Sequence, residues 1–197
     1  MNSRLVNWGG PACIVGGAIW ILIWIAYLLT HGPTMSDFRQ TFLSLTWYDF
    51  SKFVFVPLSL FLLGLFSLRA RQAGQIGRLG TVGFALAILG FVILIITVLV
   101  YWLVPFGSYD PSYRNTDLAR QLTFIQFTSP LILGIGLILF GVEHLRRNTL
   151  RQGNVLVLVT GLAVLVPYLL WTNIGFLFGA AWFAVGIAMV RDIRAAP

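Results

Sequence analysis

The residues best suited to chemistry are a glutamate and a histidine at positions 143 and 144, within the segment GVEHLRR (141–147). Glu143 is the only glutamate in the chain, and the segment ends a long apolar stretch. Consecutive helical residues point about 100° apart, so Glu143 and His144 cannot grip one ligand without help from another helix. Glu143 and Arg147 are spaced for an ion pair on a helix surface, and His144 suits the negative end of a helix dipole. We therefore interpret both as parts of an exposed helix end and not as catalytic residues.

The remaining residues predict neither a metal site nor an enzyme. His31, the other histidine, falls on the opposite side of the membrane from His144 in the topology that the charges indicate, so the two cannot share a haem or a metal ion. Cys13 is the only cysteine, which excludes an intramolecular disulfide and a cysteine metal cluster. No nucleophile elbow, HExxH motif, P-loop or paired carboxylate is present in the sequence. We expect no enzymatic activity, and the sequence indicates no particular cofactor.

The composition is that of a membrane protein. Of the 197 residues, 58% are hydrophobic and only 10% are charged, and the mean hydropathy is +0.89. A soluble domain carries more charge on its surface. A spanning helix needs about 20 mostly apolar residues, so the 39 uncharged residues between Arg151 and Arg191 must form two helices, divided near 171–173. The sequence predicts an all-α integral membrane protein, one domain over 1–197, with six transmembrane helices at about 11–30, 52–69, 79–104, 122–143, 154–171 and 174–191.

The distribution of positive charge predicts the orientation. Nine of the thirteen basic residues fall on the side that holds both termini, and the other side receives Arg39, Lys52, Arg114 and Arg120. By the positive-inside rule both termini are cytoplasmic. The net charge of +7 would suggest nucleic acid as a partner of a soluble protein, but here it reflects membrane topology. Arginine outnumbers lysine 12 to 1, and the pattern is similar to that of many small bacterial multi-pass proteins, so we expect a bacterial inner (cytoplasmic) membrane.

Three helix endings resemble one another. GLFSLR (64–69), GVEHLR (141–146) and GIAMVR (186–191) each read Gly, three variable residues, Leu or Val, and Arg. One interpretation is three pseudo-repeated helical hairpins packed around a shared axis, as repeats in transporters are. The alternative is that helices ending at the same membrane surface use the same residue types. The sequence does not decide between them.

The apolar helices carry a few polar residues that could line a pocket. No Asp, Glu, Lys or Arg is expected at membrane depth, which weakens a proton-coupled transporter or pump. The candidate pocket residues are Gln126, Thr123 and Ser129 on the fourth helix and Tyr168 on the fifth, where Pro130 and Pro167 could bend the helices. A pocket there would take a lipid, a quinone or a pigment. The simpler interpretation is hydrogen bonding between helices.

The first outer loop predicts a short interfacial helix. In SDFRQTFLSLTWYDF (36–50), Phe38, Phe42 and Leu45 form one apolar stripe, and Ser36 or Asp37 can cap the helix. The second outer loop (107–121) ends in a cap signal at Asn115 or Thr116. The acidic residues of these loops match no metal-ligand spacing, so we expect the loops to contact a partner.

Taken together, these features predict a non-enzymatic multi-pass membrane protein. The first hypothesis is an accessory or scaffold subunit that contacts the lipid bilayer, associates with other membrane subunits or with itself, and binds lipid or a hydrophobic cofactor. The alternative is a small carrier or channel for a neutral or lipophilic solute.

Overall fold

The computed structural model describes residues 3–31, 52–72, 76–103, 117–148, 153–169 and 175–194. Within these ranges the chain is all-helical, with six α-helices, one short 3-10 turn and no strand, which confirms the all-α class. The helices are α1 (Ser3–His31), α3 (Phe55–Arg71, after the 3-10 turn Lys52–Val54), α4 (Arg78–Leu103), α6 (Asp117–Arg147), α7 (Asn154–Leu169) and α8 (Phe176–Arg194). Compared with the predicted limits, α1 begins earlier, and α6 extends further in both directions.

Four of the described helices are long and apolar enough to cross a membrane, which indicates a membrane location. Their candidate spans are Val6–Leu28, Arg78–Val100, Thr128–Arg147 and Phe176–Ile193, and the shorter apolar stretch Asn154–Pro167 belongs to α7. Large apolar side chains are exposed along the outside of these helices, including Leu22, Leu89, Ile96, Ile135 and Leu162. Soluble proteins rarely expose apolar surface on this scale, whereas a bilayer accepts it.

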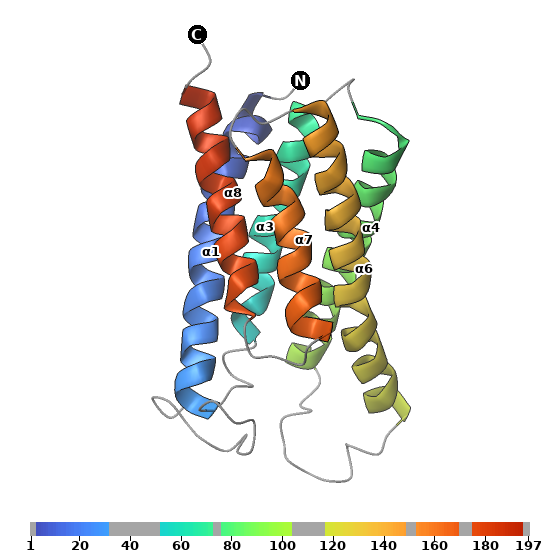
Figure 1. The fold of residues 1–197 in the computed structure, drawn as a ribbon. Coiled ribbons are helices and arrows are strands. Elements are labelled where there is room, and N and C mark those ends of the chain that lie inside the picture. The colour runs from blue at the N-terminus through green and yellow to red at the C-terminus, as the bar shows by residue number, and fades with distance from the viewer. Residues whose placement is uncertain are drawn as a thin grey trace.

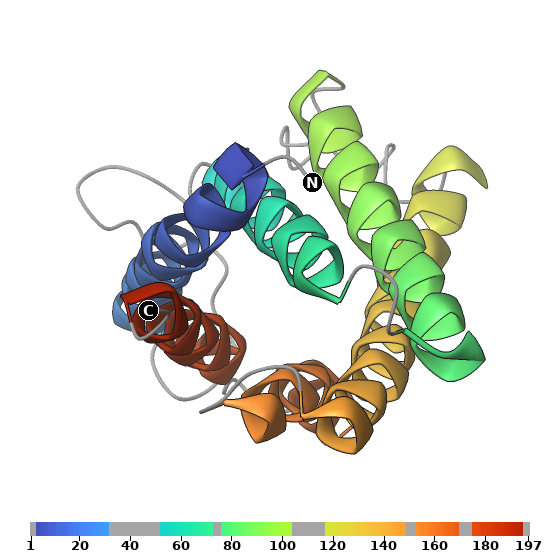
Figure 2. The same ribbon diagram turned by 90° about the horizontal axis from the view of Figure 1, so that it is seen from above.

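The helices run up and down and are arranged in a ring (Figures 1 and 2). Around the ring the order is α3, α1, α8, α7, α6 and α4. Contacts are extensive between α1 and its neighbours α3 and α8, and between α6 and its neighbours α4 and α7. They are sparser between α7 and α8 and between α3 and α4. The ring therefore consists of two tight three-helix groups, α3–α1–α8 and α4–α6–α7, which meet along an α7/α8 seam and an α3/α4 seam.

Glycines allow the close packing within each group. A Cβ added at Gly17 would lie 2.6 Å from the carbonyl oxygen of Gly179, so α1 and α8 meet backbone to backbone. A Cβ added at Gly83 would lie 2.5 Å from the backbone nitrogen of Phe140, so α4 and α6 do the same. Small residues at such contacts are the usual means by which membrane helices approach closely. Several contact glycines recur at seven-residue spacing, and the pairs are Gly9 and Gly16, Gly10 and Gly17, Gly83 and Gly90, Gly134 and Gly141, and Gly179 and Gly186.

Aromatic side chains join the two groups in the centre of the ring. Trp182 of α8 is fully buried and stacks on Phe61 of α3, with ring centroids 5.1 Å apart. Phe91 of α4 lies 6.1 Å from the Trp182 ring, and Phe178 meets Phe61 edge to face at 5.3 Å. Side chains from α3, α4 and α8 therefore fill the space that the ribbons enclose at this level.

Several expectations remain predictions. The turn at 171–173 and the interfacial helix at 36–50 lie outside the described residues, as do the caps at Asn115 and Thr116. The six-span count, the orientation and the threefold repeat also remain predictions. The glycines that open the three similar helix endings all lie at helix contacts: Gly64 against Cys13 of α1, Gly141 against Leu158 of α7, and Gly186 against the Gly10 carbonyl of α1. The packing, however, joins α7 more closely to α6 than to α8, its partner in the third predicted hairpin.

Candidate functional site

Several buried polar side chains, among them Gln72, Glu143 and His144, lie at one end of the bundle. We call this the terminal end, because α1 begins and α8 ends there (Figure 1). α3 and α6 also end there, while α4 and α7 begin there. Glu143 and His144 lie in the last turns of α6, within hydrogen-bond distance of Gly77 and Gln72 respectively.

Glu143 is buried, so the prediction of an exposed helix end is wrong for this residue. It is 3% exposed, and its Oε1 accepts a hydrogen bond from the backbone N–H of Gly77 at 2.9 Å. Gly77 immediately precedes α4, and its carbonyl accepts the bond from Thr81 that opens that helix. The Glu143 carboxylate thus lies at the positive end of the α4 dipole. A Cβ added at Gly77 would lie 2.6 Å from Oε1, and one added at Gly80 2.7 Å from Glu143 Cγ, so both glycines make room for the side chain.

The predicted ion pair between Glu143 and Arg147 is present, but only the Arg147 side chain is exposed. Arg147 Nε lies 3.1 Å from Glu143 Oε1, and the Arg147 side chain is 50% exposed. One carboxylate oxygen therefore receives both the Arg147 guanidinium and the Gly77 amide. Charge-assisted hydrogen bonds of this kind are the stronger class in proteins, and they balance the cost of burying the carboxylate.

His144 is also buried, at 1% exposure, which contradicts the expectation that it is exposed. Its Nδ1 lies 2.9 Å from Nε2 of Gln72, the residue that follows α3, and 3.1 Å from the carbonyl oxygen of Phe140. Nδ1 can accept from Gln72 or donate to Phe140, but one tautomer cannot do both. The ring also packs edge to face on Phe140 at 4.4 Å. The physical reason for the wrong expectation is that Gln72, just after α3, contacts His144, and the residue spacing within α6 does not reveal a contact with another helix.

The C-terminal end of α3 contacts α8 and α1 as well. Arg71 Nη2 donates to the carbonyl oxygen of Met189 at 3.1 Å, and Ser67 Oγ donates to the carbonyl oxygen of Val6 at 3.2 Å. Partial burial lowers the pKa of the Arg71 guanidinium from its ordinary value, and the nearby carboxylate of Asp192 opposes that shift. The end of α3 is thus tied to its own group through Met189 and Val6, and to the other group through His144.

Polar and aromatic contacts therefore close the α3/α4 seam at the terminal end. Besides the contact of Gln72 with His144, the Phe84 ring of α4 meets Phe66 edge to face at 5.6 Å, and the Arg69 guanidinium lies over the Phe84 ring at 5.8 Å. This arrangement uses Glu143 and His144 to hold helices together.

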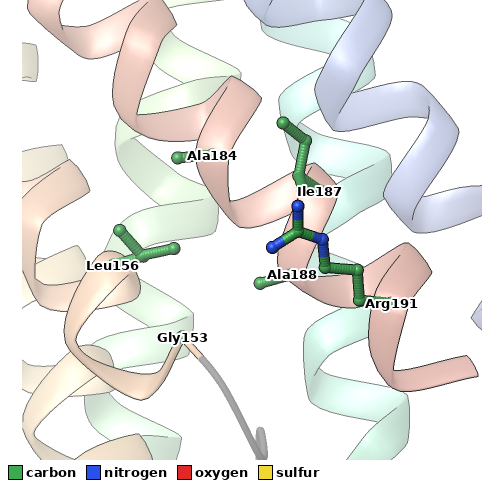
Figure 3. A pocket seen from close by; sticks show the side chains of 6 residues that line it. All are labelled: Gly153, Leu156, Ala184, Ile187, Ala188 and Arg191. Atoms are coloured by element: carbon green, nitrogen blue, oxygen red, sulfur yellow. The ribbon is translucent and has the colours of Figure 1, made fainter. Parts of the chain in front are cut away.

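The α7/α8 seam is different, because it holds a pocket of about 450 Å³. Figure 3 shows the pocket between the beginning of α7 and the last turns of α8. Gly153 immediately precedes α7 and has a φ of 136°, a backbone conformation that suits glycine. Apolar residues and one cation form the walls, and the lining residues are Gly153, Leu156, Ala184, Ile187, Ala188 and Arg191.

The predicted pocket on α6 is elsewhere. Thr123, Gln126 and Ser129 lie in the first half of α6, toward the end of the bundle opposite to the terminal end, and Tyr168 lies near the end of α7 on that side. Ser129 is fully buried. The side chains of Thr123, Gln126 and Tyr168 lie outside the described residues, so a pocket there remains a prediction. His31 ends α1 at the same opposite end, far along the bundle from His144.

The partners of Glu143 and His144 and the pocket of the α7/α8 seam are not evident from the sequence alone. A sequence signal for the partners of Glu143 and His144 was present near the start of α4. Gly77 and Gly80 flank this start, and Gln72 and Gln75 are the two amide side chains just before it. A sequence signal for the pocket was the spacing of Ala184, Ala188 and Arg191, which places these residues on one side of α8. Both signals become specific only when the neighbouring helix is known.

Comparison with known proteins gives no match: no family model, no curated protein and no solved structure is significantly similar to this chain. The fold and the apolar helices define its class as an all-α protein of the membrane. Function must be argued from the sites themselves.

In the described residues, no group of three or more His, Cys, Asp or Glu side chains could hold a metal ion. Two places remain as candidate functional sites. One is the buried polar cluster of Gln72, Gly77, Glu143, His144 and Arg147. The other is the pocket of the α7/α8 seam.

Proposed function

We propose that this chain is a multi-pass membrane protein with six spanning helices and cytoplasmic termini, and that it acts as a non-enzymatic accessory or scaffold subunit that binds lipid. The observation that supports this best is the contrast between the two seams. The α3/α4 seam is closed at the terminal end by the contact of Gln72 with His144 and by Phe84 against Phe66 and Arg69, while the α7/α8 seam holds a largely apolar pocket. An apolar recess between helices, such as this pocket, is suited to binding an apolar or amphiphilic molecule.

The contacts of Glu143 and His144 favour a structural role over an enzymatic one. The carboxylate oxygen Oε1 is occupied by Gly77 and Arg147, and Nδ1 of the imidazole by Gln72 or Phe140. A catalytic acid or base needs to reach a substrate atom within hydrogen-bond distance. Both side chains are buried and contact Gln72 or Gly77, so such an approach would require these contacts to break.

A carrier for a neutral or lipophilic solute is the second candidate, because a solute could enter the sparsely packed α7/α8 seam. The aromatic cluster around Trp182 counts against a continuous path through the centre of the ring. Flux of a lipophilic solute into liposomes that is abolished by Gln126→Leu would favour the carrier. Liposomes that stay tight to every solute tested would favour the binding subunit.

The test of the proposed function is purification from native membranes in a mild detergent. An absorption spectrum and mass spectrometry then identify everything that co-purifies. We expect a stoichiometric membrane protein partner, together with lipid that survives the washing steps. A monodisperse monomer without partner, lipid or pigment would overturn the proposal.

A further inference from the structure

We propose that the pocket of the α7/α8 seam binds one acyl chain of an anionic membrane lipid, with the lipid phosphate on Arg191. The inference rests on the proposed function and deepens it, since it names the lipid class and its site. It is carried by the shape of the pocket, the order of its lining residues along α8 and the charge at its mouth.

The size and walls of the pocket suit a hydrocarbon chain. Its volume of about 450 Å³ lies within the range of roughly 300–1,000 Å³ that is typical of small-molecule sites. Leu156, Ala184, Ile187 and Ala188 contribute only apolar side chains, and Gly153 contributes none. The alanines and the glycine leave space between helices that larger residues would fill.

Along α8 the lining residues change from apolar to cationic, in the order in which a lipid presents its acyl chain and its phosphate. Ala184 lies deepest, Ile187 and Ala188 follow, and Arg191 lies one turn nearer the terminal end. At 1.5 Å per residue the charge is about 10 Å from the deepest alanine along the helix. Arg191 also lies near the end of the candidate span Phe176–Ile193, where headgroups meet acyl chains. A bilayer lipid presents its phosphate and its chain in this same order.

Arg191 is available to an anion. It is exposed, and among the described residues no hydrogen bond or ion pair holds its guanidinium. In Figure 3 its side chain folds back beside Ile187, over the pocket, and does not extend beyond the helix end. The neighbouring carboxylate of Asp192 points about 100° around the helix axis, and its charge acts on Arg71.

The surrounding charge favours an anionic lipid over a zwitterionic one. The described terminal end also carries the basic residues Arg69, Arg71, Arg78 and Arg147, near the carboxylates of Glu143 and Asp192. Basic pockets between membrane helices on the cytoplasmic side are characteristic binding sites of anionic headgroups. A guanidinium can bind a phosphate through two parallel hydrogen bonds.

The experiment is a binding titration of the purified full-length protein, followed by native mass spectrometry. The probes are dioleoyl phosphatidylglycerol and dioleoyl phosphatidylcholine, each added in mixed micelles, with inorganic phosphate as a competitor. The variants are Arg191→Gln, Ala184→Leu, and Arg146→Gln as a matched control. Arg146 is an exposed arginine at the same end that does not line the pocket.

We expect the native protein to retain one phosphatidylglycerol in preference to phosphatidylcholine. Arg191→Gln should weaken phosphatidylglycerol binding about tenfold, as loss of a charge-assisted contact implies. Ala184→Leu should weaken binding of both lipids, because it fills the pocket. Arg146→Gln should change binding by less than about twofold.

The contrary outcomes separate this inference from the proposed function. Two outcomes would show that the assigned site is wrong although the protein binds lipid. In one, Arg191→Gln binds phosphatidylglycerol as tightly as the native protein does; in the other, Arg146→Gln weakens this binding as much as Arg191→Gln does. Displacement of the lipid by free phosphate would also overturn the inference, because it would indicate an anion site without an acyl chain. If the native protein retains neither lipid, the inference and the lipid-binding part of the proposed function both fail.

Discussion

The backbone nitrogen of Gly77 lies 2.9 Å from Oε1 of Glu143, although 66 positions of the chain separate the two residues. This contact connects the start of α4 to the end of α6 and uses the only glutamate of the protein. The residue that looked most like a catalytic acid in the sequence therefore has a structural partner. Its substitution should change stability in a measurable way.

Glu143→Gln should lower stability modestly. The amide keeps the shape and one acceptor oxygen, but it loses the negative charge that Arg147 and the Gly77 N–H share. The expected loss is about 1 kcal/mol, the difference between a hydrogen bond to a charged group and one to a neutral group. The melting temperature in detergent should fall by roughly 2–4 °C. Arg146→Gln, on the exposed side of the same turn, serves as the control, and equal melting of Glu143→Gln and the native protein would contradict this role.

The existence and order of the helices could be predicted from the sequence, because uncharged runs separated by arginines have few alternatives in a bilayer. The burial of Glu143 and His144 could not be predicted from the sequence. Local spacing identified the Glu143–Arg147 pair correctly, since both residues belong to one helix. The contact with Gly77 depends on how α3, α4 and α6 pack, and tertiary packing decides whether a helix end is covered.

The glycines illustrate the same limit. The abundance of glycine was evident from the sequence, but the sequence did not show which neighbouring helix each glycine contacts. Gly17 faces Gly179, and Gly83 faces Gly136 and Phe140, so the groups α3–α1–α8 and α4–α6–α7 are defined by contacts between residues far apart in the chain. The candidate pocket around Gln126 was inferred from polar residues near Pro130 and Pro167, whereas Arg191 is the only polar side chain among the described residues that line the pocket of the α7/α8 seam.

Gly83→Leu should prevent normal assembly of the α4–α6–α7 group. A Cβ at this position would lie 2.5 Å from the backbone nitrogen of Phe140 and 2.8 Å from the carbonyl oxygen of Gly136, and backbone atoms cannot move aside cheaply. We expect loss of the monodisperse peak in size-exclusion chromatography. Ala85→Leu, an exposed position two residues further along α4, should elute as the native protein does. Normal elution of Gly83→Leu would show that α4 and α6 are not in this close contact.

Trp182→Ala should be strongly destabilising. The indole is fully buried and stacks on Phe61, so truncation leaves a cavity where the three-helix groups meet. Large-to-small core substitutions of this kind cost about 3–5 kcal/mol. The matched control is Trp8→Ala, because Trp8 is 66% exposed, and its effect should stay within about 0.5 kcal/mol. Denaturation curves followed by circular dichroism measure both. Similar losses for the two variants would contradict the central position of Trp182.

Single-cysteine labelling should place the two ends of α6 on opposite sides of the membrane. In a Cys13→Ala background, Asn148→Cys and Gln121→Cys introduce thiols at exposed positions, which lie about 40 Å apart along the helix at 1.5 Å per residue. A membrane-impermeant maleimide should label Asn148→Cys only in inside-out vesicles and Gln121→Cys only in right-side-out vesicles. The reverse pattern would invert the proposed orientation, and labelling of both from one side would mean that α6 does not cross.

The central claim is that the protein works by binding, as a subunit that holds lipid and associates with other membrane proteins. Light scattering of the particle extracted from native membranes in mild detergent tests this claim most directly, because it separates protein mass from lipid and detergent mass. We predict a protein mass well above the 21.9 kDa of one chain, with lipid retained in proportion to protein. A protein mass equal to a single chain, with no retained lipid, would contradict the claim.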